Sequence, residues 1–280
     1  MGRIFVSGDW HGNQNGEMKY INKKYFPEQK ELSKKDVLIQ LGDFGYVWYY
    51  EEFKDFYNQE RKQLNILANK KYTILVVPGN HENYDIINKL PVINKWGGKV
   101  YVLKLEKGEI YFAVRGEVYV INNKTIFTFS GATTSSSEGR FTYEQYKSKE
   151  KVKKKKYRYG EYKKTVYEKV KLKEISYWKQ EISTEEEKEN ARKNLEKYNN
   201  KVDYVCTHTA PKFIVKEMLH DTEQNQTKIN CDTAKFLDDI SNIIEFKEWH
   251  YGHLHSNYKI IDKNNDTYKC HYSNSPEELI

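Results

Sequence analysis

The sequence predicts a layered α/β fold, and three features of its first third carry the prediction. Residues 4–6, 37–41 and 72–77 are short apolar runs rich in β-branched side chains, which is the composition of strands buried on both faces. Each run ends at a turn residue that leads into a polar side chain. Between the second and third runs, residues 51–70 carry apolar side chains at helical spacing, so strand and helix alternate as they do in α/β proteins.

The middle of the chain has a different pattern, in which short strands follow one another directly. Turn residues at 107–108 and 122–123 separate several of these strands, which predicts antiparallel hairpins. The strands are expected at 100–105, 110–114, 118–121 and 125–129.

The last third returns to helices and buried strands. Residues 184–198 form a predicted charged helix, with Ser183 as its N-cap and Glu186 as the capping-box partner. The remaining expected elements are a buried strand at 202–207, a helix at 232–246 and a closing hairpin of strands at 258–261 and 267–271.

The net charge of +7 is concentrated in one segment. Residues 147–173 hold twelve Lys and one Arg against three Glu, a local charge of +10 that leaves about −3 for the remaining residues. This pattern is typical of an insertion and not of a uniformly basic nucleic-acid-binding protein. We therefore expect one domain over residues 1–280 that carries a basic, Tyr-rich insertion at about 136–175.

Two interpretations of this insertion stay open. It fits a solvated hairpin or helical lobe with Lys-rich faces, and it also fits a nucleic-acid contact in which lysines neutralise phosphates and tyrosines stack on bases. An arginine nearby can hold a phosphate through two hydrogen bonds. The candidate substrate or nucleic-acid contacts are Lys153, Lys154, Lys155, Lys156 and Arg140.

The three cysteines, Cys206, Cys231 and Cys270, are widely spaced and favour neither a disulfide framework nor a thiolate zinc site. The apolar stretch at the N-terminus is too short for a signal peptide or a membrane span. We therefore expect a soluble, cytoplasmic protein without a membrane partner. The sequence leaves the oligomeric state open.

Polar side chains with metal-binding chemistry follow the apolar strands, at the point where each strand ends. In an open α/β sheet the carboxyl ends of the strands form the edge where ligands bind, because the loops converge there. Alternate residues of an extended segment point the same way, so Asp9 and His11 can face one ion, as can His253 and His255. The candidate set is Asp9, His11, Asp43, Asn80, His81, His208, His253 and His255.

These residue types fit two divalent metal ions. Carboxylate oxygens combined with neutral imidazole nitrogens suit Mn, Fe, Zn, Co or Ni, and we expect Mn²⁺ first among them. The two oxygens of Asp43 allow it to bridge ions about 3.5–4 Å apart, which clamp a phosphoryl group and lower the pKa of a shared water. His81, beside Asn80, is placed to give the leaving oxygen its proton.

The same motifs resemble those of the calcineurin-like metallophosphoesterase superfamily. The resemblance is ordered along the chain and spans residues 9 to 255. It rests on Asp9-x-His11, Gly42-Asp43, Gly79-Asn80-His81-Glu82, His208 and Gly252-His253-x-His255. Its implied fold is α/β, with two facing mixed β-sheets flanked by helices in a four-layer α/β/β/α sandwich. Its implied function is hydrolysis of a phosphorylated substrate, as a phosphodiesterase or phosphatase with a dinuclear centre and a bridging hydroxide.

The resemblance also implies a role for each member of the set. Asp9, His11 and His255 would hold the first metal, Asn80, His208 and His253 the second, and Asp43 would bridge them. His81 would be the general acid or a phosphate contact.

One departure from the family pattern affects His81. Family members usually carry Gly-Asp-x-x-Asp, and here Tyr46 stands at the second Asp, which in protein phosphatases orients the acid histidine. The arginine that follows in those relatives is missing too, so a protein-phosphatase-like activity is disfavoured. Glu82 or another group would have to support His81 instead.

The substrate is less well defined than the metal site. The Lys/Tyr-rich segment favours a nucleotide or a nucleic acid. The alternative is a catalytically weak metal-binding protein on the same fold, with a regulatory or nucleic-acid-binding role.

Overall fold

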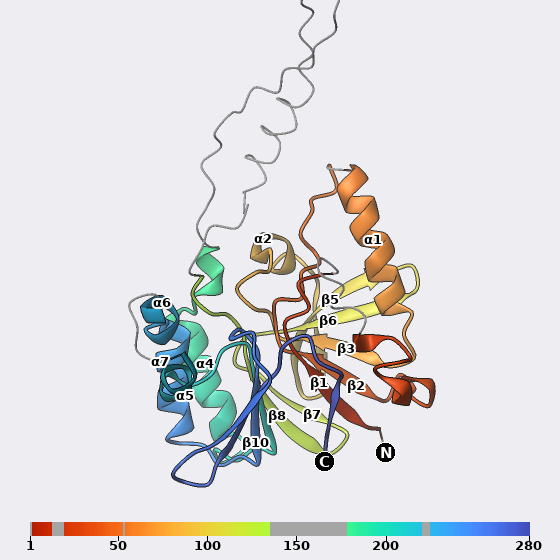
Figure 1. The fold of residues 1–280 in the computed structure, drawn as a ribbon. Coiled ribbons are helices and arrows are strands. Elements are labelled where there is room, and N and C mark those ends of the chain that lie inside the picture. Colours follow the sequence, from red (N-terminus) through yellow and green to blue (C-terminus); the bar gives the residue numbers. More distant parts are fainter. Residues whose placement is uncertain (1, 13–19, 53, 135–177, 220–224) are drawn as a thin grey trace, which may run out of the picture.

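The computed structural model describes residues 2–12, 20–52, 54–134, 178–219 and 225–280. Two β-sheets face each other in it and helices cover their outer sides, which confirms the expected α/β/β/α sandwich (Figure 1). The predicted insertion at about 136–175 lies outside the described residues, together with Arg140 and Lys153 to Lys156. No helix in the described ranges is long and apolar enough to cross a lipid bilayer.

Seven strands form the first sheet. In spatial order they are β13 (Glu277–Leu279), β1 (Ile4–Ser7), β2 (Val37–Gln40), β3 (Thr73–Val76), β6 (Gly108–Ala113), β5 (Gly98–Leu105) and β4 (Val92–Lys95). β1, β2 and β3 run parallel, with Phe5 beside Leu38 and Leu38 beside Ile74. Every residue of these three strands is buried, as their apolar composition predicted.

Six strands form the second sheet. Their order is β11 (Tyr258–Ile261), β12 (Thr267–Cys270), β10 (Glu248–Tyr251), β9 (Tyr204–Thr207), β8 (Lys124–Phe129) and β7 (Val118–Ile121). β8, β9, β10 and β12 are parallel neighbours. β11 and β12 form the predicted closing hairpin, in which Tyr258 pairs with Cys270.

The two hairpins predicted for the middle of the chain are confirmed, but they belong to different sheets. β5–β6 lies in the first sheet and β7–β8 in the second. The chain crosses between the sheets at residues 114–117, where Gly116 has a φ of 81°. That conformation favours glycine, and a Cβ at this position would also press against Ala191 of helix α4 (Glu185–Glu196).

Helices cover the outer face of each sheet (Figure 1). α1 (Lys54–Ala68) packs on the first sheet, where Leu64 and Leu67 join its core. α4, α5 (Lys212–Leu219) and α7 (Asp232–Ser241) pack on the second sheet. The shorter elements are α2 (Tyr84–Ile87), α6 (Gln226–Ile229) and the 3₁₀ helices η2 (Pro27–Lys30) and η3 (Lys179–Glu181).

The predicted helix at 232–246 is shorter than expected, because α7 ends at Ser241. Glu245 already belongs to extended chain, where it forms an isolated parallel bridge with Lys201. The backbone N–H of Glu245 donates to the carbonyl of Asn200 at 2.8 Å, and the carbonyl of Glu245 accepts from the N–H of Val202 at 2.9 Å. These bonds to the segment before β9 compete with further helical turns.

A separate apolar layer joins the two sheets. Val6, Ile39 and Leu75 of the first sheet meet Ile126 and Cys206 of the second, and all five side chains are fully buried. Cys206, two residues before His208, serves here as a small apolar side chain. Burial between the sheets fixes how the strand ends of one sheet face those of the other.

The N-terminus of α4 differs from the prediction by one residue. Thr184 is the N-cap, and its hydroxyl accepts from the N–H of Glu187 at 3.2 Å. The carboxylate of Glu187 accepts in return from the N–H of Thr184 at 2.8 Å. The predicted pair was Ser183 with Glu186, and Ser183 is instead buried without a hydrogen-bond partner for its hydroxyl among the described residues.

This one-residue shift gives a stability prediction. We expect Thr184→Ala to lower the free energy of unfolding by about 1 kcal/mol, since the cap and its reciprocal bond are lost. Ser183→Ala is the matched control, and its effect should be near zero. Urea unfolding followed by circular dichroism measures both. An equal or larger loss for Ser183→Ala would contradict the assignment.

Candidate metal centre

The candidate residues meet at one edge that the two sheets share. Asp9, Asp43 and Asn80 lie beyond the ends of β1, β2 and β3 in the first sheet. His208 and His253 lie beyond the ends of β9 and β10 in the second sheet. Because the strands within each group are parallel neighbours, their carboxyl ends come together, and the packing of the sheets brings the two groups together.

One cluster of possible metal ligands contains His11, Asp43 and His255, whose ligand atoms all lie within 4.8 Å of one another. The Nε2 atoms of His11 and His255 are 3.1 Å apart. Two imidazole nitrogens that each lie about 2.0–2.1 Å from one ion have about this separation. The Nε2 atom of His11 is 3.8 Å from Oδ2 of Asp43.

A second cluster contains Asp43, His208 and His253, again within 4.8 Å. The Nε2 atom of His208 is 3.3 Å from Oδ1 of Asp43 and 2.9 Å from Oδ1 of Asn80. Asp43 therefore belongs to both clusters. Its Oδ2 atom faces His11, and its Oδ1 atom faces His208.

Asp9 lies outside both clusters but next to the second one. Its Oδ1 atom accepts from the backbone N–H of His253 at 3.0 Å and is 3.8 Å from Nδ1 of His208. Its Oδ2 atom and Nε2 of His253 are buried without a hydrogen-bond partner among the described residues. Buried polar atoms are rarely left unpaired, so a carboxylate oxygen and an imidazole nitrogen in this state fit a bound cation.

The backbone of the centre is held in an uncommon conformation. Left-handed φ values at residues other than glycine cost about 1–3 kcal/mol each and persist only where the surrounding structure enforces them. Such strain gathers at functional sites. The positions are Asp9 at 46°, His11 at 46°, Asp43 at 49°, His253 at 66° and His255 at 49°.

Two glycines make room for the side chains of the centre. Gly42 has a φ of 87°, and a Cβ there would overlap the imidazole of His208. A Cβ on Gly79 would overlap the carboxylate of Asp43. The glycines before Asp43 and Asn80 therefore allow the β2 and β3 loops to approach each other closely.

Burial and neighbouring charges shift the pKa values of His208, His253, His255 and Asp43 toward the protonation states that bind a metal, whereas burial and the charge of Asp43 raise the pKa of Asp9 well above its usual range. Burial lowers the pKa of His208, takes the pKa of His253 well below its usual range and, with the charge of His11, lowers the pKa of His255 to about 4. Neutral imidazoles keep a lone pair for a metal. Burial opposes ionisation of Asp43, but the imidazoles around it, with His208 first, lower its pKa below the usual value.

Two buried groups around the centre orient its members. The Nδ1 atom of His208 is 2.8 Å from the carbonyl of Leu41, which directs Nε2 of the ring to the centre. The carboxylate of Glu82 accepts from the N–H of Phe44 at 2.5 Å and from the N–H of Gly79. Glu82 thus joins the loop of Asp43 to the loop of Asn80. Burial and the charge of Asp43 raise the pKa of Glu82 to about 8.

His81 lies at the mouth of the centre with a side chain that is 19% exposed. Its backbone N–H donates to Oδ1 of Asp43 at 3.0 Å, and its Nε2 atom is 4.0 Å from Oδ2 of Asp43. Glu82, which the sequence offered as a support for His81, directs its two oxygens to backbone amides. Tyr46, at the position of the usual second Asp, is buried and packs edge-on against Phe44 with 5.1 Å between ring centroids.

Four residues near the centre were not identified from the sequence. Burial is the largest cause that raises the pKa of Asp9 and lowers the pKa values of His253 and His255. The positive charge of Lys228 lowers all three pKa values and is one of the smaller causes. The ammonium group of Lys228 has no ion-pair partner within the described ranges. Thr134 donates and accepts hydrogen bonds beside Asn80, and Glu181 and Arg115 hold the segment next to it. These four residues form no local motif.

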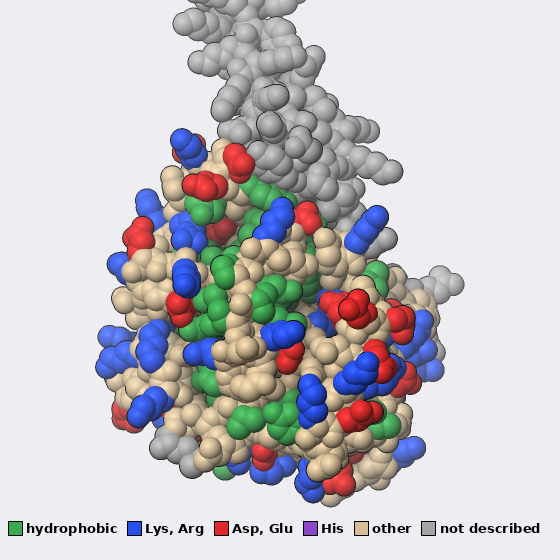
Figure 2. Space-filling view, turned by 180° about the vertical axis from the view of Figure 1, so that it is seen from behind, with side chains coloured by type: hydrophobic (Ala, Val, Ile, Leu, Met, Phe, Trp, Pro, Cys, Tyr) green, Lys and Arg blue, Asp and Glu red, His purple; other side chains and the backbone are tan. Residues whose placement is uncertain are grey.

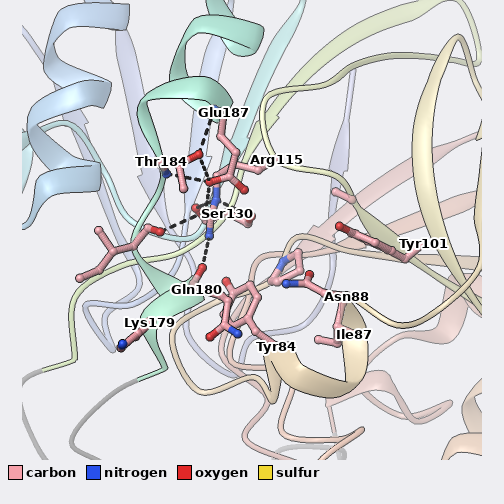
Figure 3. A pocket seen from close by; sticks show the side chains of 13 residues that line it. Tyr84, Ile87, Asn88, Tyr101, Arg115, Ser130, Lys179, Gln180, Thr184 and Glu187 are labelled. Atoms are coloured by element: carbon pink, nitrogen blue, oxygen red, sulfur yellow. Dashed lines mark hydrogen bonds and ion pairs between the residues drawn. The ribbon is translucent and has the colours of Figure 1, made fainter.

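A cavity of about 500 Å³ lies next to the centre without containing any of the eight candidate residues (Figure 3). Pro78, Tyr84 and Arg115 are among its lining residues. The hydroxyl of Tyr84 donates to the carbonyl of Gly79 at 2.7 Å, which places the cavity beside the β3 loop. The guanidinium of Arg115 donates hydrogen bonds to protein groups, including the carboxylate of Glu187 at 2.7 Å.

Two facing sheets whose strand ends bring histidine and aspartate clusters together define the class of metal-dependent phosphoester hydrolases. The family model of the calcineurin-like phosphoesterases matches residues 2–257. The chain belongs to this family, and it is a metallophosphoesterase that acts on ester bonds.

The other comparisons are more distant. The phosphopantetheinyl hydrolase of Mycobacterium tuberculosis is similar to this chain at 15% sequence identity and a TM-score of 0.46, over 100% of this chain and 96% of that one. No curated protein sequence matches the chain significantly.

Proposed function

We propose that the chain hydrolyses phosphomonoesters or phosphodiesters with two divalent metal ions held at the shared edge. By the family pattern, the first ion would be held by Asp9, His11 and His255, the second by Asn80, His208 and His253, and Asp43 would bridge them. The ligand clusters support the two histidine pairs and Asp43, while the contacts of Asp9 are to His253 and His208. One observation carries the proposal. Asp43 belongs to both ligand clusters and directs a different oxygen to each.

The donor atoms support a transition metal. Imidazole nitrogens and carboxylate oxygens at one centre suit Mn²⁺, with Fe, Zn, Co and Ni as alternatives. Ions bound there would polarise a phosphoryl oxygen and lower the pKa of a coordinated water. The unpaired Oδ2 atom of Asp9 and Nε2 atom of His253 support occupation by a cation.

His81 is the proposed general acid. Its imidazole is partly exposed at the mouth of the centre, so it can reach the leaving oxygen of an ester bound there. Its backbone N–H is bonded to Asp43, which fixes the position of His81 relative to the proposed bridge. Lys228 adds positive charge near the centre and would attract an anionic substrate.

We further propose a nucleotide or nucleic-acid substrate and a cytoplasmic setting. The charge of +10 over residues 147–173 supports the substrate class, since lysines neutralise phosphates. The described face opposite to the view of Figure 1 shows basic and acidic side chains interspersed around hydrophobic patches (Figure 2). Three buried free thiols support a reducing compartment.

Assays with two model esters test the proposal. Protein reconstituted with Mn²⁺ should hydrolyse bis-p-nitrophenyl phosphate, p-nitrophenyl phosphate or both, and the ratio of the two rates reports the preference for diesters or monoesters. A labelled oligonucleotide should bind with an affinity that falls steeply with salt and with Lys153 to Lys156 changed to Glu. Metal-loaded protein that hydrolyses neither ester would favour the alternative of a catalytically weak, metal-binding regulatory protein. Oligonucleotide binding that does not depend on salt would contradict the proposed nucleic-acid substrate.

A further inference from the structure

The side-chain amide of Asn80 must face one particular way to serve as a metal ligand. Its oxygen has lone pairs, whereas its nitrogen can only donate hydrogen bonds. In the structure Oδ1 of Asn80 points to the centre, 2.9 Å from Nε2 of His208. Its Nδ2 group points away and donates to Oγ1 of Thr134 at 3.0 Å. The acceptor on Thr134 is therefore what distinguishes the two orientations.

Thr134 is in turn oriented by a buried carboxylate. A threonine hydroxyl has one proton, and Oγ1 of Thr134 donates it to Oε2 of Glu181 at 3.0 Å. The backbone N–H of Thr134 donates to Oε1 of Glu181 at 2.8 Å. Both oxygens of Glu181 accept from backbone N–H groups, Oε1 from Thr134 and Oε2 from Trp178, so the Thr134 hydroxyl donates to Oε2 and keeps its lone pairs for Asn80. Both bonds of the relay thus have a determined direction.

Glu181 is itself rigidly held. It is fully buried at the end of η3. Arg115 holds this segment through bonds to the carbonyl of Gln180 at 2.8 Å and to the carboxylate of Glu187 at 2.7 Å (Figure 3). The N–H of Trp178 also donates to Oε2 of Glu181 at 3.3 Å. A carboxylate held by so many contacts can position another group.

We propose that Glu181, acting through Thr134, is a positioning residue that keeps the oxygen of Asn80 directed at the second metal ion. This inference rests on the proposed dinuclear function and adds residues that no motif contains. Thr134 and Trp178 flank residues 135–177 in the sequence, and both donate to Glu181. The same carboxylate therefore joins the two chain ends on either side of the basic segment and links them to a metal ligand.

Calorimetric titration of Mn²⁺ into the metal-free, full-length protein tests the relay. Loss of a group that orients a metal ligand typically weakens metal binding about 10–100-fold. We expect Thr134→Val to weaken one of the two binding steps by this factor and to leave the other step unchanged. Thr134→Ser keeps the hydroxyl and should bind both ions as the wild type does. Thr133→Val is the matched control at the neighbouring threonine and should also bind normally.

Glu181→Gln tests the second bond of the relay. Glu181 and Thr134 act on the same amide, so their effects should not add. The double variant Thr134→Val/Glu181→Gln should bind Mn²⁺ no more weakly than the single variant with the lower Mn²⁺ affinity. Wild-type affinity in Thr134→Val, an equal weakening of both steps, or additive losses in the double variant would each overturn the proposal. Thr134→Val and Thr134→Ser carry the test if Glu181→Gln does not fold.

A readout without metal separates this proposal from the proposed function. In metal-free protein the side-chain amide resonance of Asn80 should shift in Thr134→Val and stay in place in Thr133→Val. An unshifted resonance would overturn the relay even if two ions bind. Wild-type protein that binds no pair of ions would instead remove the dinuclear function, and with it the role assigned to Glu181.

Discussion

Asp43→Asn should lower turnover of either model ester by at least ~10³-fold, or about 4 kcal/mol of transition-state stabilisation. Asparagine has the shape of aspartate but only one ligating oxygen. Oδ1 of Asp43 accepts from the N–H of His81 at 3.0 Å, so the amide oxygen should keep this place. The amide NH₂ group would then point to His11 and His255, where a donor cannot bind a cation.

A buried aspartate away from the centre provides the control. Asp36 accepts from the backbone N–H groups of Arg3 at 2.7 Å and Ser33 at 2.6 Å, and it is a member of neither of the two ligand clusters. Asp36→Asn should lower stability without a comparable loss of turnover by the folded protein. Similar losses of turnover in both variants would mean that Asp43 acts through folding alone.

Removal of the metal ions should abolish turnover and lower the melting temperature by about 5–10 °C. Ligands present at 100 times their dissociation constant add about 2.7 kcal/mol, and each kcal/mol shifts the melting temperature of a chain of this size by about 2–4 °C. The physical reason is the buried pair Asp9 and Asp43, which are both less than 2% exposed. Without a cation the two buried carboxylates disfavour each other's ionised form, and burial together with the charge of Asp43 raises the pKa of Asp9.

Differential scanning calorimetry with and without a chelator measures this shift, and added Mn²⁺ should restore both the melting temperature and the activity. Asp43→Asn is the comparison, and the chelator should shift its melting temperature by a smaller amount. Superimposable melting curves of the chelated and the reconstituted wild type would show that no ion is held with useful affinity.

The strand ends of the centre could be predicted because their chemistry is local. Residues 4–6, 37–41 and 72–77 have the composition of fully buried strands, and each leads directly to a member of the candidate set. Parallel neighbours end at the same edge of a sheet, so the proximity of Asp9, Asp43 and Asn80 follows once the sheet is assumed. The assignment of each ligand to one of two metal ions, and the role of His81, were predicted from the family resemblance.

The relay beside Asn80 could not be predicted, because its members are distant in sequence. Thr134 lies 54 residues from Asn80, and Glu181 lies 47 residues from Thr134. Neither residue stands in a recognisable motif, and only the packing of the two sheets with η3 brings them together. Lys228 was missed for the same reason.

Smaller errors have local causes. Ser183 and Thr184 are each followed three residues later by a glutamate, so the sequence offers two capping boxes and cannot choose between them. The hairpins β5–β6 and β7–β8 were predicted individually, but their separation into two sheets depends on the crossing at Gly116. The end of α7 depends on the distant bridge between Glu245 and Lys201.

Asp43 is proposed to be shared by two metal ions, and elemental analysis of dialysed, Mn²⁺-reconstituted protein tests this sharing most directly. We predict about two ions per chain in the wild type and about one in Asp43→Asn, since the substitution removes the ligand facing His11 and His255. Two ions in both proteins, or one or fewer in the wild type, would contradict the account.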